Sequence, residues 1–421
     1  MNLTAKERKD IFENVVRCVR KHHFDPGMNG ADWETLVQER RSRIIESGTA
    51  EEFERELQDL LAQLRTSHTW FFHRSARQIP ARHAINATLE PQISDGGSKW
   101  MFLDVHEGGA AHRAGIEPGD LLLRVSGKEV LPPIQPTFRL GKVVEMECLK
   151  RNGTTAKAVL GIPTPRSPGH RFVQARTLTV SHPDAKTGLL KITNFLGVMG
   201  IDLARAIDRA MGELLDCNRL IIDLRGNAGG GIGGLRLMSY LMLDKVMVGY
   251  SLTRKCVQGG YDKERLPRFG RIPALKIELA LLALRFGLRD RSVAVYTEAQ
   301  SKRWYPGPVT LLVNRHTAGA SEMVAAFVKE YGRGKIVGTT TAGRFLLGST
   351  FRVGKGYMVE LPVATYRTWR DNLIEGRGVT PDVELELTID ELRAGRDLQM
   401  DRALELTTVG SKQPLYDYPG A

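Results

Sequence analysis

The stretch from Val309 to Arg344 constrains the fold of this chain more than any other part of the sequence. Its pattern predicts a buried strand over 309–314, a turn of small residues over 317–321, a helix, and a second strand over 336–338. A turn of this kind places one side chain at the N-terminus of a helix, where free backbone N–H groups and the helix dipole favour developing negative charge. Such a position suits a nucleophile.

The composition is that of a globular protein. The chain has 421 residues, 42% of them hydrophobic and 26% charged, which is ordinary for a globular protein of two or three domains. The formal net charge of +12 is spread along the sequence and lacks the interleaved aromatic residues of nucleic-acid-binding modules, so no nucleic-acid partner is expected. No apolar run is long enough to form a transmembrane segment.

The cysteines and the N-terminus bear on the cellular compartment. The four cysteines form no CxxC pair, which predicts free thiols, no metal site and no cofactor: Cys18, Cys148, Cys217 and Cys256. The N-terminal segment is charged and amphipathic, without the apolar core and small-residue cleavage site of a signal peptide. We therefore expect a cytoplasmic protein.

Residues 1–80 predict an N-terminal helical domain. Thr4 with Glu7, and Thr49 with Glu52, match the capping-box pattern at the start of two helices. The helix that starts after Thr49 carries leucines at helical spacing and ends just before Ser67 and His68.

Residues 84–163 change to short β-like runs punctuated by glycine. A short helix between strands within 108–120, the turn Pro118-Gly119-Asp120 and the apolar run after it resemble a PDZ domain. PDZ domains bind extended peptides by strand addition and hold the peptide carboxylate with backbone N–H groups. The stretch 85–92 lacks the glycines of the usual carboxylate loop, and a small β-barrel with a structural role is the alternative.

Residues 164–410 predict a βαβ-type core after a connection that ends near 187. A buried strand over 220–224 runs into a glycine cluster, and there Gly229 and Gly230 permit the close backbone approach that an oxyanion hole requires. A tight turn without a ligand is the alternative. Within the core, residues 250–306 have the character of a basic insertion. Its apolar segment over 272–288 could form a lid, a subunit contact, an interfacial helix or a buried helix with charged ends.

The order of these segments resembles the tail-specific, or C-terminal processing, serine peptidase family, to which the core of the tricorn protease is related. The resemblance covers nearly the whole chain, and its motifs are the runs 223–230, 317–322 and 378–382. It implies an α/β fold, with a crotonase-like β/α spiral core, an N-terminal helical cap and an inserted PDZ-like β-domain. It also implies that unstructured peptides are cleaved near their C-termini.

One catalytic pattern of this family uses a serine nucleophile and a lysine base. The resemblance places the nucleophile three residues before Glu322, at Gly319, and the lysine at Arg344. Glycine offers no nucleophile, and an arginine stays protonated and is no general base. The resemblance therefore predicts that this dyad is absent.

The other pattern, which is tricorn-like, uses a histidine base preceded by a serine and oriented with help from a glutamate near the C-terminus. Ser67, His68 and Glu375 occupy those positions. A histidine whose second ring nitrogen is held by a polar partner suits general base catalysis near neutral pH. A hydrogen-bonded structural histidine at a helix end is the alternative for His68.

Ser321 is the remaining nucleophile candidate in the turn. It lies two residues after Gly319, which in a regular helix turns its side chain by about 200° from that of residue 319. It would reach the same position only if the turn stays irregular as far as Ser321. The plainer expectation is that Ser321 is the N-cap of the helix.

Two functions follow from these residues. The first is a serine-type peptidase that uses Ser321, His68 and Glu375, with Ser67 in support and Gly229 or Gly230 donating to the oxyanion. The second is a catalytically inactive relative that binds peptides as an adaptor or regulator, for which Gly319 and Arg344 argue. A different acyl or small-molecule reaction at the same glycine-rich site is a weaker third hypothesis. The expected partner is a peptide or unfolded protein, and the sequence leaves room for a homo-oligomer.

Overall fold

The structure is a computed structural model that describes residues 3–74, 78–94, 97–162, 175–195, 201–231, 233–272, 278, 292–299 and 303–408. The chain divides into two compact units, each composed of three segments. The first unit comprises Met1–Ala76, Lys245–Glu298 and Gly343–Gly378. The second comprises Arg77–Asp244, Ala299–Ala342 and Val379–Ala421. We describe each unit by itself.

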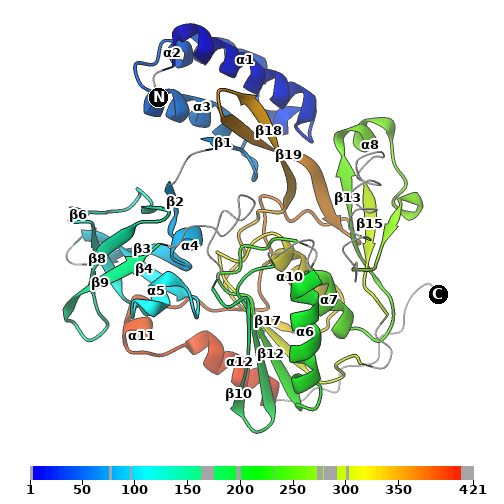
Figure 1. The fold of residues 1–421 in the computed structure, drawn as a ribbon. Coiled ribbons are helices and arrows are strands. Elements are labelled where there is room, and N and C mark those ends of the chain that lie inside the picture. Colours follow the sequence, from blue (N-terminus) through cyan, green and yellow to red (C-terminus); the bar gives the residue numbers. More distant parts are fainter. Residues whose placement is uncertain are drawn as a thin grey trace. The chain divides into compact units, whose positions relative to one another are not determined.

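The first unit begins with three amphipathic helices (Figure 1): α1 (Ala5–His22), α2 (Trp33–Ile45) and α3 (Ala50–Ala62), with the 3₁₀ turn η1 (Met28–Gly30) after α1. The predicted capping box at Thr4 and Glu7 is confirmed. At α3 the Thr49 side chain accepts from the Glu52 N–H, but the Glu52 carboxylate accepts from the Gly48 N–H, so the reciprocal bond of a capping box is missing. Helices thus occupy most of residues 5–62 of this region.

The same unit contains a mostly antiparallel sheet, ordered β1-β19-β13-β15-β14, with β18 also paired to β19. Its strands are β1 (Trp70–His73), β13 (Met247–Thr253), β14 (Arg268–Phe269), β15 (Val293–Tyr296), β18 (Leu346–Gly354) and β19 (Tyr357–Thr368). Apolar residues of the three helices pack on β1, β18 and β19 and form one core. Two short helices follow β13: α8 (Arg254–Gly259) and η2 (Lys263–Arg265). The apolar segment predicted over 272–288 lies almost wholly outside the described residues.

The second unit contains an antiparallel sheet ordered β3-β4-β5-β8-β9, with β6 paired to β5. Its strands are β3 (Ala87–Ser94), β4 (Gly97–Val105), β5 (Leu121–Val125), β6 (Lys128–Glu129), β8 (Val143–Leu149) and β9 (Thr155–Gly161). A two-stranded ribbon of β2 (Gln78–Pro80) and β7 (Thr137–Arg139) accompanies it, with the short helices α4 (Ala81–Ala84) and α5 (Ala110–Arg113). These elements share one apolar core.

The remaining sheet of the second unit positions the glycine-rich segments. Its order is β10-β11-β12-β16-β17-β20, and every pair except β10 with β11 is parallel. Its strands are β10 (Leu178–Asp184), β11 (Thr187–Ile192), β12 (Arg219–Asp223), β16 (Val309–Val313), β17 (Lys335–Gly338) and β20 (Val383–Glu384). Its helices are α6 (Ile201–Leu214), α7 (Gly234–Tyr240), α10 (Ala320–Glu330), α11 (Ile389–Arg393) and α12 (Leu398–Thr408).

Burial explains why the central residues of β12 and β16 are apolar. Ile221, Leu312 and Val337 pack with Ala403 of α12 on one face of the sheet. Their neighbours along each strand point to the opposite face because side chains alternate, and Leu220, Ile222 and Leu311 are completely buried there. The sheet therefore holds the carboxyl ends of β12 and β16 side by side, as their parallel register requires.

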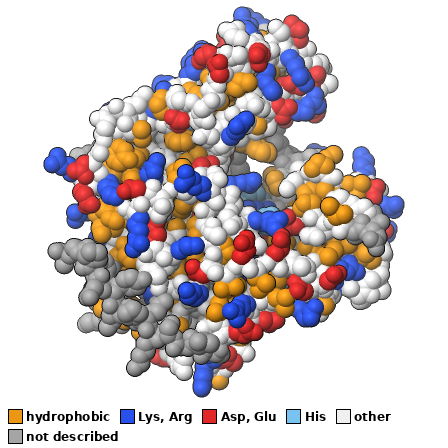
Figure 2. All heavy atoms as spheres, turned by 180° about the vertical axis from the view of Figure 1, so that it is seen from behind, with side chains coloured by type: hydrophobic (Ala, Val, Ile, Leu, Met, Phe, Trp, Pro, Cys, Tyr) orange, Lys and Arg blue, Asp and Glu red, His pale blue; other side chains and the backbone are white. Residues whose placement is uncertain are grey.

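Surface charge is mixed. On the face drawn in Figure 2, Lys and Arg side chains are interspersed with Asp, Glu and apolar side chains. Among the residues that the structure describes, no helix combines the length and the apolarity needed to cross a bilayer.

Candidate functional site

The turn between β16 and α10, which we name the elbow (residues 314–321), has an unusual backbone. Gly319 adopts φ of 60° and ψ of −124°, and α10 begins at the next residue. Non-glycine residues reach this region only at a cost of about 1–3 kcal/mol, so glycine removes the strain that a side chain would bring. Gly319 therefore suits the backbone conformation at the start of α10 and offers no side chain there.

Ser321 is not the N-cap of α10, so that expectation is wrong. Gly319 is the N-cap residue and Ser321 occupies the second position of the helix. The Ser321 side chain is fully buried. Among the described residues its Oγ finds no hydrogen-bond partner. A buried hydroxyl without a partner is rare in folded proteins and asks for an explanation.

Glu322 braces the elbow from within. Its Oε2 accepts from the Gly319 N–H at 3.0 Å, and its Oε1 accepts from the Thr341 hydroxyl at 2.7 Å. The Thr341 hydroxyl accepts in turn from the Val379 N–H at 2.8 Å. Because Glu322 is completely buried, these bonds are shielded from water and hold the backbone of residue 319 firmly.

The glycine cluster after β12 lies directly against the elbow. A Cβ added to Gly229 would fall 2.5 Å from the Ala318 carbonyl oxygen and 2.7 Å from the Ala320 nitrogen, so only glycine fits there. Asn227 joins the two segments, because its carbonyl accepts from the Ala318 N–H at 2.8 Å while its Oδ1 accepts from the Gly229 N–H at 2.9 Å. The glycine cluster and the elbow are therefore in direct contact.

This arrangement bears on whether the N–H group of Gly229 or that of Gly230 is available to donate to an oxyanion. The Gly229 N–H is already donated to Asn227. Within the described part of the chain, the N–H groups of Gly230 and Ala320 have no acceptor. Ala320 was missed by sequence reasoning, although the first residue of any helix has an N–H without an intrahelical partner. Of the N–H groups considered, those of Gly230 and Ala320 are thus the ones without an acceptor in the described part of the chain.

A buried ion pair stabilises the start of the same run. The Arg225 guanidinium bonds to both carboxylate oxygens of Asp223 at 3.0 Å and to Asp397 at 2.8 Å. Burial opposes ionisation of Asp223, but the charges of Arg225 and Lys191 outweigh it and hold the pKa of that carboxyl below its usual range. This cluster fixes the backbone that leads into Asn227.

The first unit contains the predicted base. Ser67 donates from its N–H to Glu375 Oε1 at 2.7 Å and from its hydroxyl to Oε2 at 2.8 Å. The same Oε2 accepts from the Phe345 N–H at 2.8 Å, so Glu375 ties the serine to the segment before β18. The three predicted residues are therefore close in space, with Glu375 acting on Ser67 and not on the His68 ring.

Glu360 is the residue that contacts the His68 ring. His68 Nδ1 lies 3.0 Å from Glu360 Oε1, and the two side chains are 37% and 33% exposed. Gly348 makes room for this pair, since a Cβ there would lie 2.8 Å from Nδ1. Glu360 lies opposite Trp70 in the β1–β19 pairing. The local sequence around either residue does not predict this register.

Arg344 is exposed and belongs to the first unit, whereas Gly319 belongs to the second. No cluster of three or more His, Cys, Asp or Glu side chains that could hold a metal ion occurs among the described residues.

Comparisons with known proteins agree with these features. The model of peptidase family S41 matches residues 186–385, which include the glycine cluster, the elbow and Glu375. Carboxyl-terminal-processing peptidase 2 of Arabidopsis thaliana chloroplasts is 25% identical, over 89% of this chain and 68% of its own. Tricorn protease homolog 1 of Streptomyces coelicolor is 24% identical over 96% of this chain, but the chain spans only 35% of that relative.

A solved structure shows the same fold. The photosystem II D1 C-terminal processing protease superposes with a TM-score of 0.56 at 20% sequence identity, over 95% of this chain and 99% of that one. The fold is thus the mixed α/β fold of C-terminal processing proteases. The motif runs, the family match over residues 186–385 and these relatives agree in relating the chain to peptidase family S41, the tail-specific or C-terminal processing peptidases.

Proposed function

We propose that this chain is a serine-type peptidase that cleaves unstructured peptides or proteins near their C-termini. The observation that carries the proposal is the set of bonds around His68, in which Glu360 holds the ring and Glu375 holds the preceding serine. Carboxylate-held histidines serve as general bases in acyl transfer. The carboxyl-terminal-processing relatives support the same activity.

His68 supplies the proton transfer. With Nδ1 held by Glu360, Nε2 is the ring nitrogen left to accept a proton from a nucleophile. His68 itself has a positive φ of 57°, which is uncommon for a residue with a side chain. The two bonds from Ser67 to Glu375 support that backbone from the residue before it. Ser67 and Glu375 are therefore positioning residues in this proposal.

Ser321 supplies the nucleophile in this proposal. Because α10 already begins at Ala320, the first turn of the helix has to rearrange to bring the Ser321 Oγ to the position of residue 319. Its Oγ attacks the scissile carbonyl carbon as its proton passes to a general base, and the leaving amine takes that proton as the peptide bond breaks. Water then hydrolyses the ester and restores the serine. Negative charge on the carbonyl oxygen is stabilised by the N–H groups of Gly230 and Ala320. Since Ser321 is buried, substrate binding has to open access to it.

A second function is favoured by one specific observation. Residue 319 has the backbone conformation of a nucleophile turn but is a glycine, and Ser321 is buried. A chain in which neither position provides a hydroxyl to substrate would bind peptides without cleaving them. In that case the affinity for an unstructured peptide would be about micromolar and no product would form.

Three finer assignments belong to the proposal. We assign residues 84–163 as a PDZ-like domain, because a short helix and the Pro118 turn lie between strands of a small antiparallel sheet. The βαβ units of β11, β12, β16 and β17 favour a crotonase-like core. The domain ranges 1–80, 84–163 and 164–410 and a cytoplasmic location stay predictions.

Peptide hydrolysis by the purified chain tests the proposed function. The wild type should cleave an unstructured peptide, and Ser321→Ala should lower the rate by about 10⁴-fold or more. Ser181→Ala, an exposed serine of the same unit, should leave the rate unchanged and serves as the matched control. If the wild type binds the peptide and releases no product over many hours, the peptide-binding function replaces the peptidase.

A further inference from the structure

A buried carboxylate of the antiparallel sheet in the second unit contacts the elbow. Asp104 lies near the end of β4, and both of its oxygens accept from the side-chain amide of Asn314 at 3.1 Å. Asn314 is the first residue of the elbow, and the two residues are only 9% and 4% exposed. Neither takes part in the catalytic steps described above. Because burying a carboxylate costs free energy unless its hydrogen bonds are satisfied, the contacts of Asp104 indicate its role.

The Asn314 amide joins the elbow to the glycine cluster. Its Oδ1 accepts from the Gly226 N–H and from the His316 N–H, each at 3.0 Å. An ionised carboxylate only accepts hydrogen bonds, so Asp104 has to face the amide nitrogen and leaves the amide oxygen to the two N–H groups. The opposite orientation would set the amide NH₂ against two donors. Asp104 thus fixes the direction in which the Asn314 amide points.

Asp104 is itself held in place by the neighbouring strand. The Thr88 hydroxyl on β3 donates to Asp104 Oδ2 at 2.5 Å, and the Asp104 N–H donates to the Thr88 hydroxyl oxygen at 3.1 Å. Burial opposes ionisation of Asp104, but the nearby His316 and His106 rings and the Thr88 hydroxyl outweigh it. The pKa of this carboxyl therefore lies below its usual range, and the side chain is a charged acceptor at neutral pH.

Arg82 binds the same two residues that Asn314 binds. Its Nη2 donates to the Gly226 carbonyl at 3.1 Å and to the His316 carbonyl. Asn314 thus takes the N–H groups of Gly226 and His316, while Arg82 takes their carbonyls. Arg82 belongs to α4, which shares one apolar core with β3 and β4. We name Arg82, Asp104 and Asn314 the clamp, because together they hold residue 226 close to residue 316.

Gly226 packs directly against Asp104. It has φ of 70°, and a Cβ there would lie 2.8 Å from Asp104 Oδ2, so only glycine fits. The next residue, Asn227, makes the bonds that join the glycine cluster to the elbow. The position of Gly226 therefore bears, over short buried bonds, on the positions of the Gly230 and Ala320 N–H groups.

We propose that the clamp positions the N–H groups of Gly230 and Ala320 for the oxyanion, which makes Arg82 and Asp104 positioning residues of the reaction. The inference rests on the proposed function. Donors of an oxyanion hole act at about 3 Å from the oxygen, and a displacement of about 1 Å can lower a rate by about 100-fold. Buried charges add little net stability, since apolar side chains of similar volume often stabilise as much. What the polar contacts of the clamp add is a fixed geometry at the elbow.

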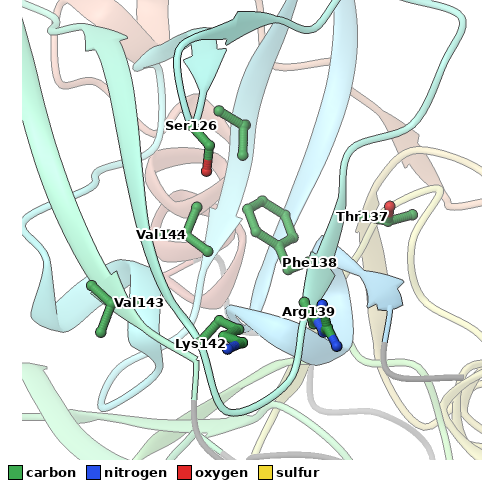
Figure 3. A pocket seen from close by; sticks show the side chains of 8 residues that line it. Ser126, Thr137, Phe138, Arg139, Lys142, Val143 and Val144 are labelled. Carbon is green, nitrogen blue, oxygen red and sulfur yellow. The ribbon is translucent and has the colours of Figure 1, made fainter. Parts of the chain in front are cut away.

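The clamp is separate from the cavity that Figure 3 shows in the same unit. That cavity lies among the end of β5, the strand β7 and the start of β8, and its lining includes Ser126, Phe138 and Lys142. None of its lining residues belongs to the clamp. Substitutions in the clamp therefore leave the lining of the cavity unchanged, and their effects report on the elbow.

An exchange of the two clamp side chains tests the proposal by kinetics. Asp104→Asn should lower kcat for an unstructured peptide about 10- to 100-fold with little change in KM, because the oxyanion donors act on the transition state. The double variant Asp104→Asn/Asn314→Asp restores a carboxylate–amide pair with the roles reversed, keeps an acceptor for both N–H groups, and should recover most of the lost kcat. Asp208→Asn is the matched control. It removes a carboxylate of the same unit that accepts from the Tyr240 hydroxyl, and it should leave kcat unchanged.

Hydrogen exchange measures the same placement without turnover. The amides of residues 226–230 and 316–320 should exchange at least about tenfold faster in Asp104→Asn than in the wild type, because the bonds that hold these segments are weakened. The double variant should exchange about as slowly as the wild type. Thermal unfolding of Asp104→Asn and Asp208→Asn shows how much of the change is a general loss of stability.

Two results overturn the proposal. Equal kcat in the wild type and Asp104→Asn would keep the peptidase and remove the clamp. A loss of kcat that the double variant does not recover, or that comes without faster exchange in the two segments, would assign Asp104 to general stability. If the wild type hydrolyses no peptide but exchange depends on the clamp, the peptidase is rejected while the placement of the glycine cluster by the clamp stands.

Discussion

The surroundings of His68 in the first unit and the elbow in the second are held in place by different kinds of interaction. Around His68 the geometry depends on side chains, with Glu360 on the ring and Glu375 on Ser67, and the histidine is partly exposed. At the elbow the geometry depends on backbone, with Gly319 in a strained region and its N–H held by the buried Glu322.

This difference explains what a substitution can remove. Loss of one side chain at the base would dismantle the hydrogen-bond network there. At the elbow residue 319 has no side chain, yet the bond from its N–H to Glu322 is present. Among the described residues, the N–H groups of Gly230 and Ala320 have no acceptor. The backbone of the elbow therefore keeps its conformation without a side chain at residue 319. What has to be identified is the hydroxyl group that acts as the nucleophile.

The largest expected effect is at the base. His68→Ala should lower kcat/KM for an unstructured peptide by about 10³-fold, because proton transfer by a positioned side chain contributes about 10²–10⁴-fold. His73→Gln changes another histidine of the same unit, which contacts the Lys355 carbonyl, and should have little effect on kcat. Steady-state kinetics with both variants decide the matter. Full activity in His68→Ala would contradict the role of the base.

Gly319→Ser tests whether the elbow can position a nucleophile at residue 319. The serine hydroxyl should enter a preformed position and raise the rate of hydrolysis about 100-fold, since correct placement of a reacting group is worth that much. Gly319→Ala is the control, because both variants should lose about 1–3 kcal/mol of stability to the positive φ and only the serine should gain activity. If Gly319→Ser is destabilised but hydrolyses the peptide no faster than Gly319→Ala, the elbow does not position a nucleophile at residue 319.

Acid should weaken the unit that holds the elbow. Burial lowers the pKa of His106 to about 4 and that of His83 to about 4, whereas an unfolded histidine titrates near 6.5. The unfolded chain therefore takes up protons first, so this stabilisation is complete above pH 6.5 and is lost as the pH falls toward 4. His106 lies against Gly226, at the start of the glycine cluster.

Urea unfolding at pH 7.5 and pH 5 measures that loss. Each histidine should contribute about 2 kcal/mol to the difference in unfolding free energy between the two pH values. His106→Gln should shrink the difference by about that amount. A variant with the same pH dependence as the wild type would show that His106 is not the group that titrates.

The smallest effect concerns the two glutamates of the base. Glu360→Gln weakens the contact that holds the His68 ring and should lower kcat about tenfold with little change in KM. Glu375→Gln instead weakens the bonds to Ser67 and Phe345 and should reduce stability by about 1–3 kcal/mol. The pair is compared by kinetics and thermal unfolding together. Equal effects of both variants on kcat would mean that Glu375 also acts through the ring.

Sequence reasoning predicted the elements whose signals are local. The capping residues of α1, the apolar strands β12 and β16 and the small-residue elbow follow from propensity, burial and chain flexibility. The proximity of Ser67 to Glu375 followed from the family resemblance, since 308 residues separate them. The N-cap at Gly319 was missed because serine is the commoner capping residue.

Contacts that depend on strand register could not be predicted. Glu360 meets His68 only because β19 pairs with β1, and no pattern near either residue fixes that pairing. The choice of Gly230 over Gly229 as a donor depends on the side chain of Asn227, which takes one N–H and leaves the other. Such details arise from tertiary packing and have no separate sequence signal.

The identity of the nucleophile is the central claim, and covalent labelling tests it most directly. The wild type, His68→Ala and Gly319→Ser are each treated with a fluorophosphonate, and mass spectrometry locates the modified residue. The account predicts an adduct on Ser321 in the wild type that disappears in His68→Ala. An adduct on residue 319 in Gly319→Ser, with Ser321 of the wild type unmodified, would contradict it.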